Sequence, residues 1–193
     1  MNLDALSDLV LLLVCVGIAV PAYRARPGVA IALGLVGLAA AFGVLRFSGV
    51  GVLLGPHRFA SMLSACAAFP LLAASLRWPD APTARRATAA SRFVLVWGGV
   101  GVALHLVTGG LWSQVVPGVA ALVIVWTALQ QRSTASVAGA ALLVGSFVVA
   151  ALGKPGALYL GLFNSTQALH YLLAAGLLLL CLPRQAVPVV RAA

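Results

Sequence analysis

The stretch LSDLVLLLVCVGIAVPAYRARPGVAIALGLVGLAAAFGVL, residues 6–45, consists of two apolar runs joined by a short basic connection. Each run is close to the ~20 residues that a helix needs to cross the ~30 Å hydrocarbon core of a bilayer. Pro21 and Pro27 flank the connection, and proline favours turns over continued helix. Arg24 and Arg26 lie between the two prolines. The stretch therefore predicts two membrane-spanning helices joined by a tight loop.

The rest of the chain repeats this pattern. Hydrophobic residues make up 63% of its 193 residues and charged residues only 8%, whereas a soluble domain carries about 25% charged residues. The sequence therefore predicts an all-α, polytopic transmembrane helical bundle of seven spans, in which residues 1–193 form a single domain. The apolar runs are Leu6–Tyr23, Gly28–Leu45, Phe59–Leu76, Phe93–Thr108, Val115–Leu129, Ala135–Leu152 and Ala157–Leu182.

The fourth and fifth runs are short for a full crossing. They either extend into the residues between them, 109–117, or form a shallower hairpin, so six spans is the alternative count. Pro117 suits the first turn of a helix, where its missing N–H costs nothing.

The basic residues give the orientation. With the N-terminus outside and seven spans, nine of the twelve basic residues fall on the inner side, which follows the positive-inside rule. The expected topology is therefore N-out and C-in. The inner residues are Arg24, Arg26, Arg77, Arg85, Arg86, Arg92, Arg132, Arg184 and Arg191, and the outer ones are Arg46, Arg58 and Lys154. The preference for Arg over Lys, with many Ala, Val, Leu and Gly residues, favours a high-GC bacterial genome and hence a bacterial cytoplasmic (inner) membrane.

The net charge of +9 does not indicate nucleic acid as a partner, because the basic residues are spread over short loops and form no dense stripe. The expected partners are the lipid bilayer and a small ligand or lipid.

Polar side chains gather in the outer half of the predicted bundle. His57, Ser61 and Ser64 follow i, i+4, i+7 spacing and share one helix face. Since intramembrane polar groups normally face the bundle interior or a water-filled cavity, the sequence predicts an outward-opening polar pocket. The candidate lining residues are Asp8, Arg46, His57, Arg58, Ser61, Ser64, His105, Asn164, Gln167 and His170.

The last apolar run carries most of this signal, as FNSTQALHYLLAAGLLLL, residues 163–180. If its helix starts near Ala157, Asn164 is ~10 Å deep and His170 ~20 Å deep. Hydrogen bonds between helices are the alternative role for Asn164 and Gln167. A charge that favours the helix N-terminus is the alternative role for Asp8.

The chain offers little for catalysis. It contains no Glu, and it lacks the HExxH, GxSxG, phosphate-loop and CxxC patterns. The leading hypothesis is therefore a membrane protein that binds or passes a small polar or amphipathic ligand, with no catalytic residue assigned. The alternative is a zinc-dependent membrane hydrolase of lipid-like substrates, with His57, His105 and His170 as metal ligands. Haem held by two of the histidines is a further possibility.

Three resemblances bear on these hypotheses. The seven-span layout with three His, Ser61 and Asp8 resembles the ceramidase and progestin-receptor-type superfamily of membrane hydrolases, which implies a zinc site inside the bundle. In that superfamily two histidines lie one turn apart on the last helix, whereas Thr166 precedes His170 here.

The segments ALSDLVLLL, residues 5–13, and FNSTQALHYLLAAGLLLL resemble small bacterial seven-span integral membrane proteins, and this resemblance implies no activity. The order of spans is also similar to sugar-transporter-like bundles of three, one and three helices, although the Pro-Gln dipeptide typical of their relatives is absent.

Overall fold

A computed structural model describes residues 2–153, 158–159 and 162–181, and this part of the chain is helical with no β-strand beyond one isolated bridge between Tyr159 and Phe163. The helices are α1 (Leu3–Ala22), α2 (Pro27–Phe47), η1 (Gly51–Leu53), α3 (Leu54–Leu63), η2 (Ser64–Ala68), α4 (Phe69–Arg77), α5 (Pro82–Arg85), α6 (Ala87–Val107), α7 (Trp112–Gln131), α8 (Thr134–Leu152) and α9 (Ser165–Cys181).

Within the described part of the chain, six helical segments are long and apolar enough to cross a membrane. One of them, Gly51–Arg77, joins η1, α3, η2 and α4 into 27 continuous residues. Both short runs lie in helices of membrane-spanning length: α6 has 21 residues because it begins at Ala87, before the predicted run, and α7 has 20 because it begins at Trp112, within the connection. The remaining apolar helix, α9, has 17 residues, which corresponds to about 26 Å at ~1.5 Å per residue.

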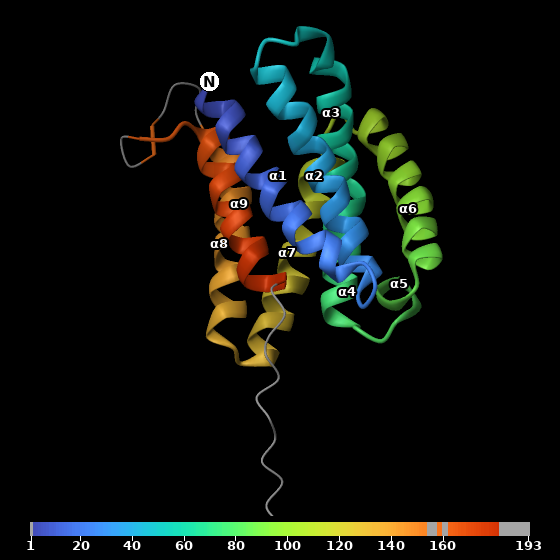
Figure 1. Cartoon of the computed structure of the whole chain (residues 1–193). Coiled ribbons are helices and arrows are strands. Elements are labelled where there is room, and N and C mark those ends of the chain that lie inside the picture. The colour runs from blue at the N-terminus through green and yellow to red at the C-terminus, as the bar shows by residue number, and fades with distance from the viewer. Residues whose placement is uncertain (1, 154–157, 160–161, 182–193) are drawn as a thin grey trace, which may run out of the picture.

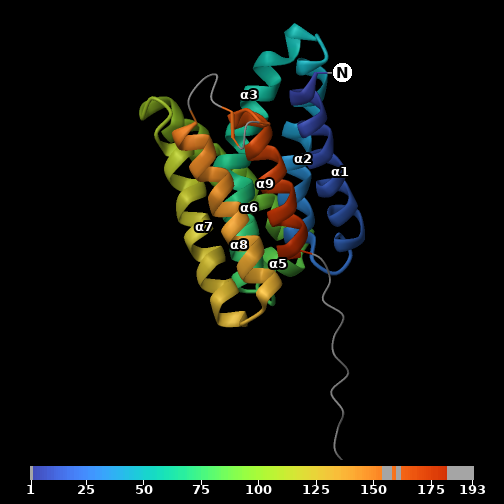
Figure 2. The same ribbon diagram turned by 90° about the vertical axis from the view of Figure 1, so that its left-hand side faces the viewer.

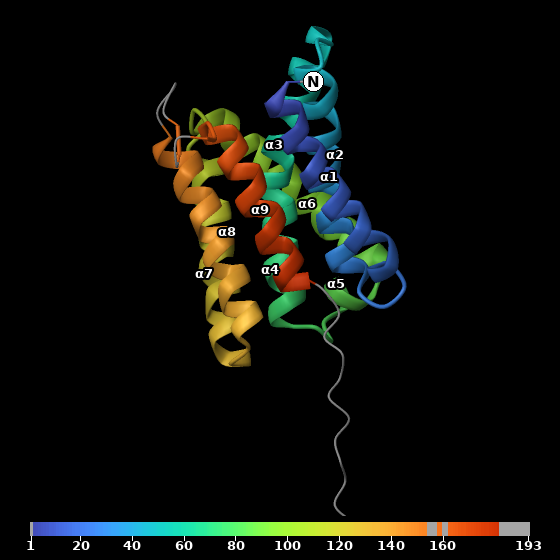
Figure 3. The same cartoon turned by 60° about the vertical axis from the view of Figure 1, so that its left-hand side comes forward.

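The long helices run up and down and pack as one bundle (Figure 1). The upper end is the end at which α1 begins, at the top of Figure 1. Helix α1 packs between α2 and α9, and α9 packs against α8, which packs against α7. The composite helix from α3 to α4 fills the middle and contacts α2, α6 and α7 (Figure 2). Helices α1 and α9 start at the same end and lie side by side, although the whole chain separates them (Figure 3).

The composite helix Gly51–Arg77, called the central helix below, changes its hydrogen-bond pattern at η2, which is a π-helical turn. The Phe69 N–H donates to the Ser64 carbonyl five residues earlier. Pro70 has no N–H, so the Cys66 carbonyl lacks the donor that an α-helix would give it, and a break in the regular ladder is expected here. π-turns of this kind occur often at functional sites.

The last helix begins later than the sequence predicted. It starts at Ser165 instead of Ala157, so Asn164 lies just before the helix and His170 only about 8 Å along it at ~1.5 Å per residue. Lys154, Arg184 and Arg191, which the predicted topology assigned to loops, lie outside the described residues, as do the predicted ends of this run, Ala157 and Leu182.

The lower half of the bundle is packed mainly with apolar side chains, and a separate cavity of about 230 Å³, lined by Arg26, Val29 and Ser75 among others, lies at its lower end. The largest fully buried apolar side chains include Leu33, Leu72, Ile124, Leu143 and Leu177, which belong to one core cluster from five helices. Helices α8 and α9 approach each other closely at Gly139 and Gly176. A Cβ atom added at Gly139 would lie only 2.9 Å from the Gly176 carbonyl oxygen. Small residues at contacts suit helices that associate by van der Waals packing.

Candidate ligand site

The polar residues at the start of α9 form a capping box. The Asn164 side-chain oxygen accepts a hydrogen bond from the Gln167 N–H at 2.9 Å, and the Gln167 side-chain oxygen accepts one from the Asn164 N–H at 3.3 Å. A capping box satisfies two backbone N–H groups that the first turn of a helix leaves unpaired. The amides of Asn164 and Gln167 therefore fix where α9 begins.

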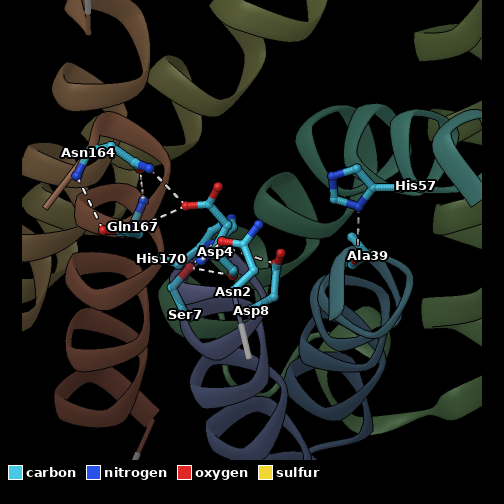
Figure 4. Close-up of polar contacts among 9 residues, drawn as sticks. All are labelled: Asn2, Asp4, Ser7, Asp8, Ala39, His57, Asn164, Gln167 and His170. Carbon is cyan, nitrogen blue, oxygen red and sulfur yellow. Dashed lines mark hydrogen bonds and ion pairs between the residues drawn. The ribbon is translucent and has the colours of Figure 1, made fainter. Parts of the chain in front are cut away.

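The same two side chains bind Asp4 on α1. The Asp4 Oδ1 atom accepts hydrogen bonds from Asn164 Nδ2 at 2.8 Å and from Gln167 Nε2 at 2.7 Å (Figure 4). Asp4 lies in the first turn of α1 and beside the first turn of α9, so the positive ends of two helix dipoles favour its negative charge. This network, made by Asp4, Asn164 and Gln167, is called the α1–α9 junction below.

One turn further into the bundle, Ser7 connects the junction to His170. The Ser7 hydroxyl donates to the Asp4 carbonyl at 2.8 Å and lies 3.1 Å from His170 Nδ1. Because the Ser7 hydroxyl donates its own proton to the Asp4 carbonyl, it can only accept a hydrogen bond from His170. The Nδ1–H group of His170 therefore donates to Ser7 Oγ. Ser7 is fully buried and His170 is 9% exposed.

Asp8 follows Ser7 and is also buried, with 1% of its surface exposed. His170 Nδ1 lies 3.4 Å from Asp8 Oδ1, which is within ion-pair range, yet neither carboxylate oxygen of Asp8 has a hydrogen-bond partner among the described residues. The carboxylate lies against Gly43 of α2, where an added Cβ would overlap both of its oxygens. A glycine at residue 43 is therefore what leaves space for a carboxylate between α1 and α2.

Asp8 and His170 open onto a cavity of about 220 Å³, called the buried cavity below. His57, Ser61 and Ser64 of the central helix also line it, as their shared face predicts. Its remaining walls are mostly apolar and come from six helical segments: Leu11, Val36, Ala39, Ala40, Ala65, Phe69, Ser113, Pro117, Phe147, Ala150, Leu169 and Leu173. An apolar cavity with a few polar groups is the usual form of a small-molecule site.

A second, wider cavity of about 600 Å³, called the mouth, adjoins the first at the upper end of the bundle. The two share His57, Ser61, Ala65 and Ser113 as lining residues. The mouth is more basic, with Arg46, Arg58 and His105 in its wall together with Phe59, Met62 and Leu106.

The ten residues predicted for the pocket thus divide into three groups. Asp8, His57, Ser61, Ser64 and His170 line the buried cavity, and Arg46, Arg58 and His105 line the mouth. Asn164 and Gln167 line neither of these two cavities, and their side chains bind Asp4 and the first turn of α9.

The three histidines do not form the predicted metal site. His57 Nδ1–H donates to the Ala39 carbonyl at 3.1 Å, while His105 Nδ1 lies 3.0 Å from the Ser113 hydroxyl and His170 contacts Ser7. In the part of the chain that the structure describes, no three His, Cys, Asp or Glu side chains are arranged to hold a metal ion. The residues present therefore do not fit a three-histidine zinc centre, since His57, His105 and His170 are not arranged around a common point.

Sequence reasoning missed Asp4, Ser7 and Ser113. The pattern Asn-x-x-Gln at 164–167 is a capping-box signature and would have placed the start of α9. No sequence pattern predicts the contact between Asp4 and Asn164, which are 160 residues apart. This contact exists only because α1 and α9 pack side by side.

The chain matches no protein-family model, no curated protein and no solved structure. The site offers a carboxylate, two imidazoles and hydroxyl groups around an apolar cavity. These groups provide hydrogen-bond donors and acceptors next to a hydrophobic wall.

Proposed function

We propose that this chain is a seven-span membrane protein, N-out and C-in, that binds or passes a small polar or amphipathic ligand through a cavity open to the outer side. Helix α9 is the seventh span in this proposal. Its 17 residues suit a crossing that starts at the interface with the capped Asn164, where polar groups remain partly hydrated. The directions of α1 to α9 then put the mouth at the outer surface.

One observation carries the proposal. The buried cavity gathers polar side chains from α1, the central helix and α9, which lie far apart in the sequence, and surrounds them with apolar ones such as Phe69 and Phe147. The rings of Phe69 and Phe147 pack edge to face with their centroids 4.9 Å apart, which is a favourable aromatic contact in this wall. A volume of about 220 Å³ is below the ~300–1,000 Å³ of sites for drug-sized molecules, which favours a small ligand.

The buried cavity shares lining residues with the mouth at the upper end and none with a separate cavity of about 230 Å³ at the lower end, which Arg26, Ser75 and Leu180 help to line. The lower half also contains the leucine-rich core that includes Leu33, Leu72 and Leu177, which are fully buried. We therefore expect binding from the upper side. Passage across the membrane requires a second conformation in which this core parts, as in alternating access.

A thermal-shift screen in nanodiscs tests the binding proposal. The probes are compounds of equal chain length and different headgroup: hexylamine, hexanol, hexanoate and 6-aminohexanoate. Ala65 lines both cavities, so Ala65→Phe fills the passage between them. The matched control is Ala103→Phe on the exposed face of α6.

At least one probe is expected to raise the melting temperature of the wild type and of Ala103→Phe, with the shift lost in Ala65→Phe. The proposal fails if every shift persists in Ala65→Phe, or if no probe produces one.

Labelling of intact cells with a membrane-impermeant thiol reagent tests the threading. In a background with Cys15, Cys66 and Cys181 replaced by Ala, Ser61→Cys in the cavity wall is expected to react from outside. Arg132→Cys, at the lower end between α7 and α8, is expected to react only after the cells are opened. The reverse pattern would overturn the N-out orientation.

A further inference from the structure

Among the described residues there are three carboxylates, and Asp8 alone accepts no hydrogen bond, although its Oδ1 atom lies 3.4 Å from His170 Nδ1. Asp4 accepts two amide hydrogen bonds and Asp80 pairs with Arg85 at 2.8 Å. Asp8 is the most buried of the three, and both of its oxygens lack a hydrogen bond. A buried carboxylate without donors is costly, so such a group is expected to have a partner that arrives with the ligand.

The partner must be a donor that fits an apolar cavity. Asp8 lines that cavity together with His170 and apolar side chains, and the packing against Gly43 holds its carboxylate in place. An ammonium group with N–H bonds provides both the positive charge and the donors that two free carboxylate oxygens accept. A quaternary ammonium provides the charge without the donors.

The mouth favours a negatively charged group, whereas Asp8 favours a positively charged one. Arg46 and Arg58 line it, and no carboxylate among the described residues pairs with either of them. Arg46 instead lies over the Phe47 ring, 4.6 Å from its centroid, which holds the guanidinium near the opening. A lone cation would be repelled on its way past two arginines, whereas an anionic group would be held there.

A single ligand satisfies both sites if it carries a positive and a negative charge. We infer that the ligand is a small zwitterion, an inference that rests on the proposed function. Its ammonium group binds Asp8 in the buried cavity, and its carboxylate or phosphate binds Arg46 and Arg58 at the mouth. The apolar walls around Phe69 contact the carbon chain between the two charges. A free amino acid-like molecule and the ethanolamine phosphate headgroup of a lipid share this chemistry.

Binding of 6-aminohexanoate to the wild type in phosphatidylcholine nanodiscs tests the free-ligand form. Its affinity is expected to exceed that of hexylamine and of hexanoate. Asp8→Asn is expected to weaken it about tenfold or more, since a charged hydrogen bond is lost. Arg46→Gln, a second variant at the mouth, is expected to weaken it several-fold. The matched control, Arg132→Gln, lies at the lower end and is expected to leave the affinity unchanged.

Lipid composition tests the headgroup form. Replacing part of the phosphatidylcholine by phosphatidylethanolamine is expected to raise the melting temperature of the wild type more than that of Asp8→Asn, because the trimethylammonium of phosphatidylcholine has no N–H. Stabilisation by 6-aminohexanoate or by phosphatidylethanolamine that depends on both Asp8 and Arg46 supports the inference and identifies the source.

The inference is overturned if neither zwitterion stabilises the wild type, or if their effects persist in Asp8→Asn. A shift by hexylamine, hexanol or hexanoate that Ala65→Phe abolishes would then leave the proposed function standing. If Ala65→Phe changes no probe's effect, the proposed function fails as well.

Discussion

The α1–α9 junction and the buried cavity lie one helical turn apart, and each contains an aspartate from α1. Asp4 in the junction accepts hydrogen bonds from Asn164 and Gln167, whereas Asp8 in the cavity accepts none among the described residues. Asp4 is partly exposed and satisfied, and Asp8 is buried and unsatisfied. The difference separates a carboxylate that joins two helices from one whose oxygens accept no hydrogen bond, to which we assign the ligand.

The largest expected effect on stability is at Asp4. Asp4→Ala removes two charge-assisted hydrogen bonds and leaves two amide donors without their acceptor, so we expect the free energy of unfolding to fall by about 2–4 kcal/mol. Asp8→Asn is expected to change it by less than ~1 kcal/mol or to raise it, because the cost of burying an unpartnered charge is removed. Titration with a denaturing detergent in mixed micelles measures both. Equal losses in the two variants would contradict the distinction between the two aspartates.

A smaller effect is expected where α2 makes room for Asp8. Gly43→Ala places a methyl group on the Asp8 carboxylate, and overpacking of this kind costs about 1–3 kcal/mol. Gly34 on the same helix has no heavy atom within 4 Å of an added Cβ. Gly34→Ala is therefore expected to be neutral or slightly stabilising, since alanine favours helix. The same detergent titration compares the two, and equal stability in them would show that the carboxylate is not held against residue 43.

The smallest of the three effects is expected at the cap of α9. Asn164→Ala removes the capping oxygen and one donor to Asp4, with an expected loss of about 1 kcal/mol. The ligand-dependent shift is expected to remain, because Asn164 lines neither cavity. Thr166→Ala, which removes none of these contacts, is the control for a substitution in the same turn. If the ligand-induced rise in melting temperature disappears in Asn164→Ala, Asn164 takes part in ligand binding and the assignment made here is wrong.

The sequence predicted the helices well because apolar runs of membrane length leave few alternatives. The helix ends were harder to predict than the helices themselves. The polar first turn of α6 belongs to the helix although it precedes the apolar run, and the apolar Leu158 lies before α9 begins. The π-turn at η2 was not predicted, although Pro70 is the residue that accounts for it.

The lining of the two cavities was predictable where polar residues share a helix face or lie at a similar depth in the bundle. His57, Ser61 and Ser64 line one cavity as their spacing requires. The roles of Asp4 and Asp8 were not predictable, because two aspartates one turn apart near a helix start look alike in a sequence. Their difference arises from neighbouring helices, with Asn164 and Gln167 beside one and Gly43 beside the other.

The most direct test of the account measures the 6-aminohexanoate-induced rise in melting temperature for Asp4→Asn and Asp8→Asn side by side. We predict that Asp4→Asn lowers the melting temperature of the free protein and keeps the ligand-induced rise, and that Asp8→Asn keeps the melting temperature and loses the rise. A ligand-induced rise that survives in Asp8→Asn, or that disappears in a folded Asp4→Asn protein, would contradict the account.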